Sequence, residues 1–485
     1  GNLTWRVFVD SMIQTAMSTA MIFLFLNGCF YFEEKIERKP DVMVVVLDTV
    51  RADHLSTYGY EKKTSPILSA LAKQGVLFED VTAPSSWTWP SHASIFTGTK
   101  PWEHGAHRSS QGTQMEGSDW FLSSMDSSLP TMAEVFTQAG YDTYAYSTNM
   151  LLKKELGLMR GFQHVHAIDD EEATMNAALE VLSKEHEKPV LLFVNLMTAH
   201  APYLVNNAVP YSTRHVADYT KETAPNDWRT PYLFDGYPGI HFPIFMNNGL
   251  NGEMAVRKGG LDIPFKDKQA VIDIYDGELL RLDYMLGSLL RSWGDRTGII
   301  AVTSDHGEYL FEHDRVGHGV ELHPPVLSVP LVLAYPGVLE PNRVSNPTSL
   351  IRLAPTLISL AGLEGEGALA SQYNVFEYRD EIIEAAVWGF SDWAASVDAQ
   401  FGLRRRWYRQ GNLGGWVDEN GGLWVCDLAT DSMCMQDVSK ENEKWVHEIT
   451  KKALLGFQEE KQLGISPEEE EKRLQILRSL GYIDD

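Results

Sequence analysis

The chain has 485 residues, of which 44% are hydrophobic and 22% charged, a composition that excludes whole-chain disorder, collagen and coiled coil. Its length fits one large domain with a smaller one beside it. The formal net charge of −25 excludes the basic surface of a nucleic-acid-binding protein. An anionic substrate would therefore need a local positive centre, such as a metal ion.

The first forty residues contain a long apolar segment. Residues 11–32 carry no charged side chain, and as a helix they would be long enough to cross a bilayer. We expect residues 1–40 to be a membrane anchor or signal segment with a charged linker, which places the protein outside the cytoplasm. Lipidation at Cys29 and a buried soluble helix are the alternatives. The basic residues after the segment leave its orientation open.

Apolar runs then alternate with amphipathic stretches. Five runs have the pattern of strands buried on both faces of a sheet: 41–48, 141–147, 190–196, 298–304 and 329–335. Helical periodicity is found near 131–139, 173–184 and 270–293, and a short helix is expected after the cap residue Ser65. The alternation predicts an α/β fold, with a large, mainly parallel sheet sandwiched by helices.

Two later regions depart from this alternation. Residues 204–265 are rich in Pro, Gly, Asn and aromatic residues, which is typical of an insertion that forms a lid or a substrate wall. From about 371, short strand-like segments predict a small antiparallel sheet, and a terminal helix is expected between Ser466 and Gly481. We therefore expect a catalytic domain at 41–370 and a C-terminal subdomain with a helical tail at 371–485.

The three cysteines form no Cys-x-x-Cys pair, so a thiolate zinc site is not expected. Cys426 and Cys434 lie eight residues apart. They either form a disulfide in an oxidising compartment or remain two free thiols.

Polar residues follow three of the predicted strands. Asp48 ends the first, His200 follows the run at 190–196, and Asp305 and His306 follow the run at 298–304. Ligands of open parallel α/β sheets bind beyond the carboxyl ends of the strands, so these four side chains are expected in one cleft. A lone Asp after a strand is usually only a turn or cap residue, but an adjacent Asp-His pair is harder to explain in that way.

A fourth element contributes Thr88. Pro90 suits the first turn of a helix, which puts Thr88 at a helix N-terminus, where free N–H groups bind anions. Taken alone, Thr88 is most simply an N-cap. Trp87 and Trp89 on either side are either core residues or a wall of the substrate site.

Taken together, these segments resemble the sulfatase family of the alkaline phosphatase superfamily. The stretches that carry the resemblance are 43–60, 86–105, 191–203, 275–283 and 303–319, in an order and spacing specific to that fold. The resemblance extends over residues 40–485. It implies the fold predicted above and a metal-dependent hydrolase of sulfuric or phosphoric esters.

The resemblance also implies roles for individual residues. Asp48, Asp305 and His306 fall on the family's metal ligands. Thr88 falls on the catalytic nucleophile, which also touches the metal. His200 and His318 fall on positions that contact the transferred group or the leaving oxygen. The chemistry agrees, because a divalent cation stabilises the oxyanion and activates a hydroxyl, and an imidazole can protonate the leaving group.

Several departures separate this chain from typical sulfatases. Those enzymes oxidise a Cys or Ser at the position of Thr88 to formylglycine, and Thr cannot give that aldehyde. His92 replaces the Arg of the same motif, Thr49 replaces a second Asp, and the stretch 140–149 lacks the usual Lys and His. The set resembles more closely the Thr-nucleophile branch, which includes phosphoethanolamine transferases and phosphodiesterases.

We therefore predict a hydrolase that cleaves a phosphodiester, a phosphonate monoester or a sulfate ester through Thr88. A membrane-tethered phosphoethanolamine-type transferase and an inactive binding module are the alternatives. Three oxygen ligands and one imidazole favour manganese or zinc, with calcium and magnesium also open. The expected substrate is a small or a lipid- or glycan-linked anionic ester.

The neighbouring residues have less specific predictions. His104, His107, His313 and His323 are expected to support the site or lie at the surface. The run 404–406 is expected to be a solvated strand face or a substrate contact.

Overall fold

The computed structural model describes residues 38–109, 113–114, 121–200, 265–377, 382–389 and 402–459. The apolar segment with Cys29, the insertion up to residue 264 and the predicted helix after Ser466 lie outside these residues. Within them, no helix is both long and apolar enough to cross a membrane. The chain divides into two units, 1–39 and 40–485, and the following description concerns the second.

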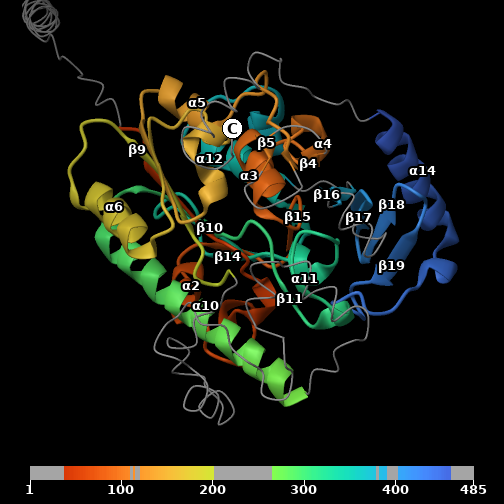
Figure 1. The fold of residues 1–485 in the computed structure, drawn as a ribbon. Coiled ribbons are helices and arrows are strands. Elements are labelled where there is room, and N and C mark those ends of the chain that lie inside the picture. Colours follow the sequence, from red (N-terminus) through yellow and green to blue (C-terminus); the bar gives the residue numbers. More distant parts are fainter. Residues whose placement is uncertain are drawn as a thin grey trace, which may run out of the picture. The chain divides into compact units, whose positions relative to one another are not determined.

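An eight-stranded sheet forms the centre of this unit (Figure 1). Its strands, in spatial order, are β14 (Asn342–Val344), β2 (Val76–Phe78), β13 (Leu331–Ala334), β10 (Gly298–Thr303), β1 (Asp41–Leu47), β9 (Val190–Leu196), β7 (Asp142–Ser147) and β8 (His164–Ala167). The strands from β10 to β8 are parallel, and β13 is antiparallel to both β10 and β2. The prediction of a mainly parallel sheet is thus confirmed, and all five predicted strands are present.

Strand β1 shows why the sheet needs helices on both faces. Val42, Val44 and Val46 point to one face and Met43 and Val45 to the other, and all are fully buried. The first face packs against α3 (Thr88–Thr97), α5 (Met132–Gln138) and α12 (Leu353–Leu360). The second packs against α2 (Pro66–Ala72), α6 (Glu171–Ser183) and α10 (Phe265–Trp293). The predicted sandwich is confirmed.

The helix starts follow local capping. Thr131 and Glu134 form a capping box that begins α5. Helix α6 begins two residues before its predicted start, because the Asp170 side chain accepts from Ala173 N. Ser65 is the N-cap of α2 and Pro66 lies in its first turn, as predicted, but the Ser65 hydroxyl makes no cap bond and pairs instead with the Thr57 backbone and hydroxyl.

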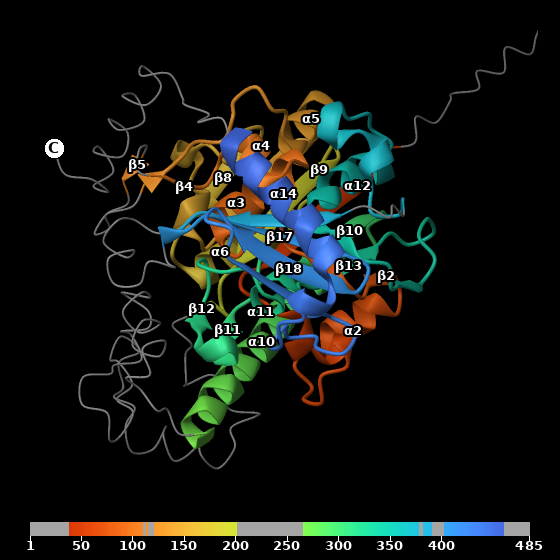
Figure 2. The ribbon, with the colours of Figure 1, turned by 90° about the vertical axis from the view of Figure 1, so that its right-hand side faces the viewer.

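A second, four-stranded antiparallel sheet lies beside the main body and is drawn in blue in Figure 1. It consists of β16 (Ile383–Val387), β17 (Arg405–Gln410), β18 (Leu413–Asp418) and β19 (Leu423–Asp427). Helix α14 (Glu443–Glu459) lies across it (Figure 2) and buries Ile449 and Ala453 against Tyr408 and Val425. The small sheet was predicted, whereas β16 and α14 were not.

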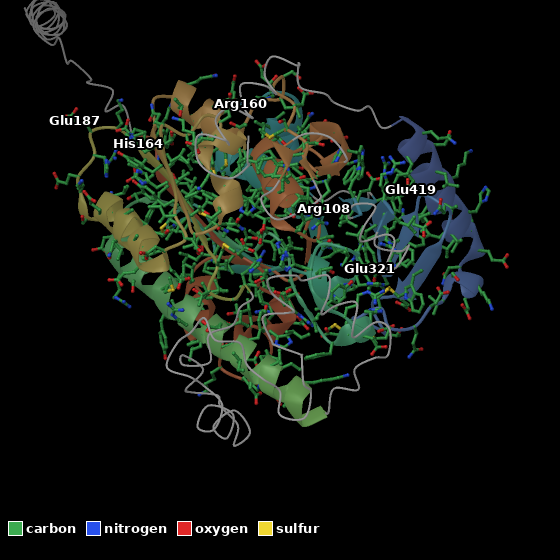
Figure 3. All side chains as sticks on the ribbon, viewed as in Figure 1. Arg108, Arg160, His164, Glu187, Glu321 and Glu419 are labelled. Carbon is green, nitrogen blue, oxygen red and sulfur yellow. A yellow bond between two sulfur atoms is a disulfide. The ribbon has the colours of Figure 1, made fainter. Side chains whose placement is uncertain are left out.

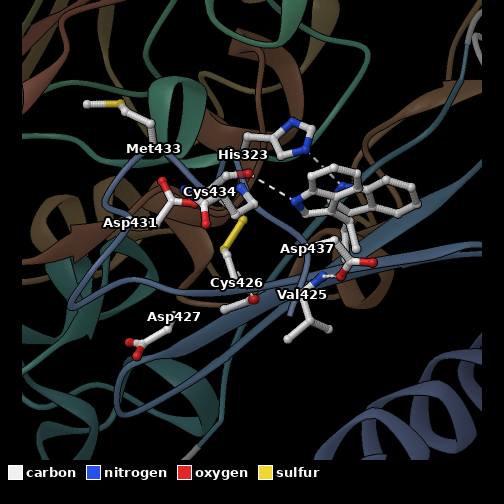
Figure 4. Close-up of a disulfide and its surroundings, with 12 residues drawn as sticks. His323, Val425, Cys426, Asp427, Asp431, Met433, Cys434 and Asp437 are labelled. Carbon is white, nitrogen blue, oxygen red and sulfur yellow. Dashed lines mark hydrogen bonds between the residues drawn. A yellow bond between two sulfur atoms is a disulfide. The ribbon is translucent and has the colours of Figure 1, made fainter. Parts of the chain in front are cut away.

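Two details of this sheet correct or settle expectations. Arg405 and Arg406 on β17 are 1% and 4% exposed, so the run 404–406 is not a solvated strand face. Cys426 and Cys434 form a disulfide (Figure 4), which decides between the two alternatives for this pair. The Trp424 indole donates to the Cys434 carbonyl over 2.9 Å and fixes the bridged loop on the sheet.

Several short elements complete the fold. They are α4 (Pro101–His104), α11 (Pro324–Leu327), the ribbon of β11 (Tyr309–Leu310) and β12 (Val316–Gly317), the pair β3 (Val81–Thr82) and β15 (Thr348–Ser349), and the small sheet of β4 (Arg108–Ser109), β5 (Thr113–Gln114) and β6 (Phe121–Leu122).

Candidate active site

The carboxyl ends of β1 and β10 bring three potential metal ligands together. Asp48 directly follows β1, and Asp305 and His306 follow β10, its parallel neighbour. All three side chains are fully buried, and one ligand atom of each lies within 4.8 Å of the others. The structure therefore unites these three predicted residues, which are distant in sequence.

The ligand atoms of these three residues face one another. His306 Nδ1 donates to the Gly307 carbonyl over 2.9 Å, which leaves the Nε2 lone pair exposed to the site. This atom lies 3.4 Å from Asp305 Oδ2 and 3.7 Å from Asp48 Oδ1. Neither oxygen accepts a hydrogen bond from any residue that the structure describes. Three buried electron-pair donors aimed at one point fit a cation.

The second oxygen of each carboxylate is held by the protein. Asp48 Oδ2 accepts from the Asn149 and Asn195 amides over 3.0 and 3.2 Å. Asp305 Oδ1 accepts from the His306 and Thr49 backbone N–H groups over 3.0 and 3.4 Å. These bonds fix the direction of each remaining oxygen, as outer hydrogen bonds do in metal sites.

The pKa shifts show the electrostatic cost of this arrangement. Burial, followed by the Asp48 carboxylate, raises the pKa of Asp305 well above its ordinary value. Burial, followed by His318, lowers the pKa of the His306 imidazole well below its ordinary value. Both groups are therefore driven toward neutrality by their surroundings, and a bound cation would reverse the effect on the carboxylate.

Thr88 is the first residue of α3, and its N-cap is Trp87, so Thr88 is not itself the cap. Its hydroxyl oxygen lies 3.4 Å from His306 Nε2 and accepts from the Asn149 amide over 3.2 Å. Pro90 occupies the first turn of the helix, as predicted. The side chain is thus placed at the metal-ligand cluster and at a helix N-terminus.

His92 lies one helical turn after Thr88. Its Nδ1 donates to the Thr88 carbonyl over 3.0 Å and is 3.4 Å from Asp305 Oδ2. Burial lowers the pKa of His92 to about 4, so the ring is neutral at pH 7. It therefore supplies no positive charge to the site.

The turn after β1 is strained. Thr49 has a φ of 60°, a region that β-branched residues rarely adopt and that costs about 1–3 kcal/mol. Its carbonyl accepts from the Tyr275 hydroxyl over 2.8 Å, and the next amide, of Val50, donates to Ser304 Oγ over 3.0 Å. The bonds hold the turn in the conformation that directs Asp48 into the site.

His200 and His318 lie at the outer side of the cluster. Both are partly exposed, and the His318 ring is 4.5 Å from that of His306 and 4.9 Å from that of His200. His318 Nδ1 donates to Glu308 Oε1 over 2.9 Å, and Glu308 is fully buried. Nε2 of His318 is therefore the nitrogen that can exchange a proton with a ligand. All six predicted site residues thus belong to one cluster.

Asn149, Asn195 and Glu308 were not singled out from the sequence. Asn195 could have been found from the sequence, because it is a polar residue within the apolar strand β9. Asn149 follows the end of β7, the same position along its strand as the other site residues. Glu308 follows the Asp-His pair by two residues.

The remaining polar candidates have other partners. The four histidines that flank the motifs lie outside the cluster: His104 bonds Ser94 and Ala106, His107 stacks on Trp388, and His313 and His323 stack on each other. Trp87 and Trp89 are 4% and 0% exposed and belong to the core.

Comparisons with known proteins identify the family of this chain. The family model described as Sulfatase matches residues 40–363. A Delta 4,5-hexuronate-2-O-sulfatase of Bacteroides thetaiotaomicron is 19% identical over 350 residues, which are 67% of this chain and 69% of that protein. An ulvan-active sulfatase of Formosa agariphila is 23% identical over 364 residues, 72% of this chain and 56% of that protein.

Solved structures share the fold. A structure in complex with its substrate D-glucosamine-2-N,6-O-disulfate has a TM-score of 0.63 at 17% identity, covering 87% of this chain and 98% of its own. A phosphonate monoester hydrolase of Agrobacterium radiobacter has a TM-score of 0.58 at 17% identity, covering 87% and 96%. At such identities these neighbours establish the architecture alone.

Proposed function

Because this chain belongs to the sulfatase family, whose model spans residues 40–363, we propose that it is a metal-dependent hydrolase of a singly charged ester, with Thr88 as nucleophile. The observation that carries the proposal is the position of the Thr88 hydroxyl, 3.4 Å from the His306 nitrogen on which Asp48 and Asp305 also converge. A nucleophile beside a cation site at a helix N-terminus suits attack on an anionic ester.

Asp48 Oδ1, Asp305 Oδ2, His306 Nε2 and Thr88 Oγ1 would hold the divalent cation. When bound, such an ion supplies the positive charge that stabilises the transition state and lowers the pKa of a hydroxyl ligand. Mixed oxygen and imidazole donors favour manganese or zinc, whereas sulfatases typically use calcium or magnesium. The identity of the ion is therefore part of the test below.

The protein groups have separable tasks. The Asn149 amide donates both to Thr88 Oγ1 and to Asp48 Oδ2, so it fixes the nucleophilic oxygen beside the cation ligands. His318, held at Nδ1 by Glu308, can carry a proton at Nε2 for the leaving oxygen. His200, whose ring is next to that of His318, is the second imidazole available to the substrate.

The charge balance favours particular substrates. Among the described residues, no Lys or Arg side chain is bonded to Asp48, Thr88 or Asp305. One divalent cation could therefore serve any ester that carries a single negative charge. Phosphodiesters, phosphonate monoesters and sulfate monoesters all meet this condition. Since Thr88 cannot become formylglycine, we place the two phosphorus esters ahead of the sulfate ester.

The test is a panel of three matched aryl esters, one of each kind, assayed with manganese, zinc, calcium and magnesium in turn. We expect turnover of the phosphodiester or phosphonate to exceed that of the sulfate. Thr88→Ala should abolish turnover and Thr88→Ser keep a measurable part. Thr97→Ser, a buried threonine at the other end of α3, is the control and should be unaffected.

Each outcome has a distinct meaning. Dominant sulfate turnover would overturn the phosphoryl preference and leave the site intact. Full activity of Thr88→Ala would exclude Thr88 as the nucleophile. Added alcohols distinguish hydrolysis from transfer, because a transferase would form the ester of the added alcohol at the expense of the phosphate monoester or phosphonate that hydrolysis releases. A protein that binds no divalent ion and turns over none of the esters would be the inactive binding module.

We further propose that the protein acts outside the cytoplasm, anchored by residues 11–32. The Cys426–Cys434 disulfide supports this proposal, because such bonds persist in oxidising compartments. Cell fractionation of the full chain is the test. Recovery in the soluble cytoplasmic fraction would refute both the location and the anchor.

A further inference from the structure

The backbone after His318 is held by two buried arginines from different parts of the fold. The Gly319 carbonyl accepts from Arg108 Nη1, and the Val320 carbonyl accepts from Arg405 Nη1 over 3.0 Å. Arg108 is 6% exposed and lies on β4, whereas Arg405 is 1% exposed and lies on β17 of the C-terminal sheet. Two consecutive carbonyls are thus fixed by charge-assisted bonds.

Arg108 connects this backbone to the nucleophile. Its guanidinium lies 4.1 Å from the centre of the Trp87 ring, and Trp87 directly precedes Thr88. Gly319 has a φ of 88°, and a Cβ there would come within 2.9 Å of Arg108 Nη2 and 3.4 Å of Trp87 Cβ. The arginine, the tryptophan and the glycine are therefore in close packing between Thr88 and His318.

Arg405 connects the same backbone to the C-terminal sheet. Its Nη2 lies 3.9 Å from Glu321 Oε1, and that oxygen also accepts from Arg315 Nη2 over 2.6 Å. Arg108 and Glu321 both lie on the side of the main body that faces the C-terminal sheet (Figure 3). Three successive residues, 319–321, are therefore anchored immediately after His318.

The loop before His318 explains why such anchoring is needed. Phe311, His313 and Asp314 all have positive φ values, of 83°, 53° and 53°. Non-glycine residues in this region are strained, so they persist only where the surroundings hold them. A loop under strain would relax, and the His318 ring with it, if the segment behind it were released.

We propose that Arg108 and Arg405 are positioning residues that act through His318, so that the C-terminal sheet takes part in the reaction without contributing a group to the catalytic cluster. This inference rests on the proposed role of His318 at the leaving oxygen. A general acid must be placed within a fraction of an ångström of its target, and the hydrogen bond that His318 donates to Glu308 fixes the ring but not the backbone that carries it.

The experiment uses two aryl esters of the kind that the enzyme turns over in the panel above. One has a good leaving group that needs no proton, and the other has a poor leaving group that needs one. Arg405→Lys and Arg108→Lys are compared with Arg406→Lys. Arg406 is the neighbour on β17, is equally buried, and stacks instead on Trp102 and Phe457 at 4.1 and 5.1 Å. Gly319→Ala is a further variant, in case a lysine variant does not fold.

We expect kcat for the poor leaving group to fall about tenfold or more in Arg405→Lys, Arg108→Lys and Gly319→Ala, as when a general acid is misplaced. Turnover of the good leaving group and both KM values should stay within about twofold, because substrate binding is retained. Arg406→Lys should match the wild type. In a His318→Ala background, Arg405→Lys should cause no further loss.

The outcomes separate the two hypotheses. If His318→Ala leaves both esters unaffected, the proposed role of His318 fails. If His318→Ala slows the poor leaving group alone while the arginine and glycine variants do not, the positioning role is overturned. Equal loss with both esters, or the same loss in Arg406→Lys, would reveal a merely structural role and would also overturn it.

Discussion

Asp48 and Asp305 each direct one carboxylate oxygen at the same atom, Nε2 of His306, over 3.7 and 3.4 Å. Their other oxygens are fixed by amide and backbone donors, so the side chains cannot easily turn away. Buried like charges repel strongly in a medium of low dielectric constant. The arrangement therefore carries strain without a cation and is relieved by one.

Metal removal should accordingly lower the stability of the wild type, and Asp305→Asn should abolish this dependence of stability on metal. We expect a divalent ion to raise the Tm of the wild type and a chelator to lower it. Asp305→Asn keeps the oxygen that accepts from Thr49 and His306 but removes one negative charge. Its metal-free form should be at least as stable as the metal-free wild type, yet inactive.

Asp283→Asn is the control for this experiment. Asp283 is also a buried carboxylate that accepts two backbone N–H bonds, from Ile67 and Leu68, but it lies on α10, outside the cluster. It should retain the metal response. Melting curves with and without ions, together with elemental analysis, test whether Asp305 binds the metal. Metal retained in Asp305→Asn would exclude Asp305 as a ligand.

Variants of Asn149 and Asn195 can distinguish a role in positioning the nucleophile from a role in holding the cation ligands. Both donate to Asp48 Oδ2, but only Asn149 also reaches Thr88. Asn195→Ala should weaken metal affinity about 10- to 100-fold and leave kcat near normal at saturating metal. Asn149→Ala should lose kcat about 100- to 1,000-fold even when saturated, comparable to the loss of one preorganised donor. Identical behaviour of the two variants would contradict the role given to Asn149.

The cation site could be predicted from the sequence because its ligands lie directly after the ends of buried strands. Asp48, Asp305 and His306 follow apolar runs, and parallel strands present their carboxyl ends on one edge. Helix α14 and strand β16 were missed for a different reason. Both are stabilised by tertiary packing, with Glu384 of β16 buried beside Lys100 and Lys452, which no local pattern reveals. The roles of Arg108 and Arg405 depend in the same way on contacts between distant segments.

His104 makes stability depend on pH. Burial lowers the pKa of His104 to about 3, and its Nδ1 accepts from Ala106 N over 3.0 Å, which requires the neutral ring. Because the folded-state pKa lies below the ordinary 6.5, this contribution is fully present above pH 6.5. It is lost progressively as the pH falls toward 3.

His104→Asn should flatten this dependence. The asparagine oxygen can still accept from Ala106 N, while the bond to Ser94 is lost, so stability at pH 7 should fall by about 1 kcal/mol. The free energy of unfolding, measured by denaturant between pH 7 and pH 4, should then vary less than in the wild type. The exposed His164→Asn is the control, and an unchanged slope in His104→Asn would refute the assignment.

The disulfide should stabilise the C-terminal sheet. Closing a loop of this length is worth roughly 2–3 kcal/mol by the chain-entropy model. Cys426→Ala combined with Cys434→Ala should lower the denaturant midpoint by a corresponding amount, and a reductant should do the same to the wild type alone. A double variant as stable as the oxidised wild type would show that packing of Trp424 already fixes the loop.

The order of the site residues along the chain has a consequence for biosynthesis. Thr49 and Asp305, which are hydrogen-bonded in the folded protein, are 256 residues apart in sequence. Pairing of β1 with β10 is therefore a contact of high sequence separation, of the kind that forms slowly. A nascent or truncated chain that ends before Asp305 lacks half of the cation ligands, however well its first strands fold. Ion binding would thus be acquired only when β1 pairs with β10, and a metal titration during refolding would report the moment at which these two strands meet.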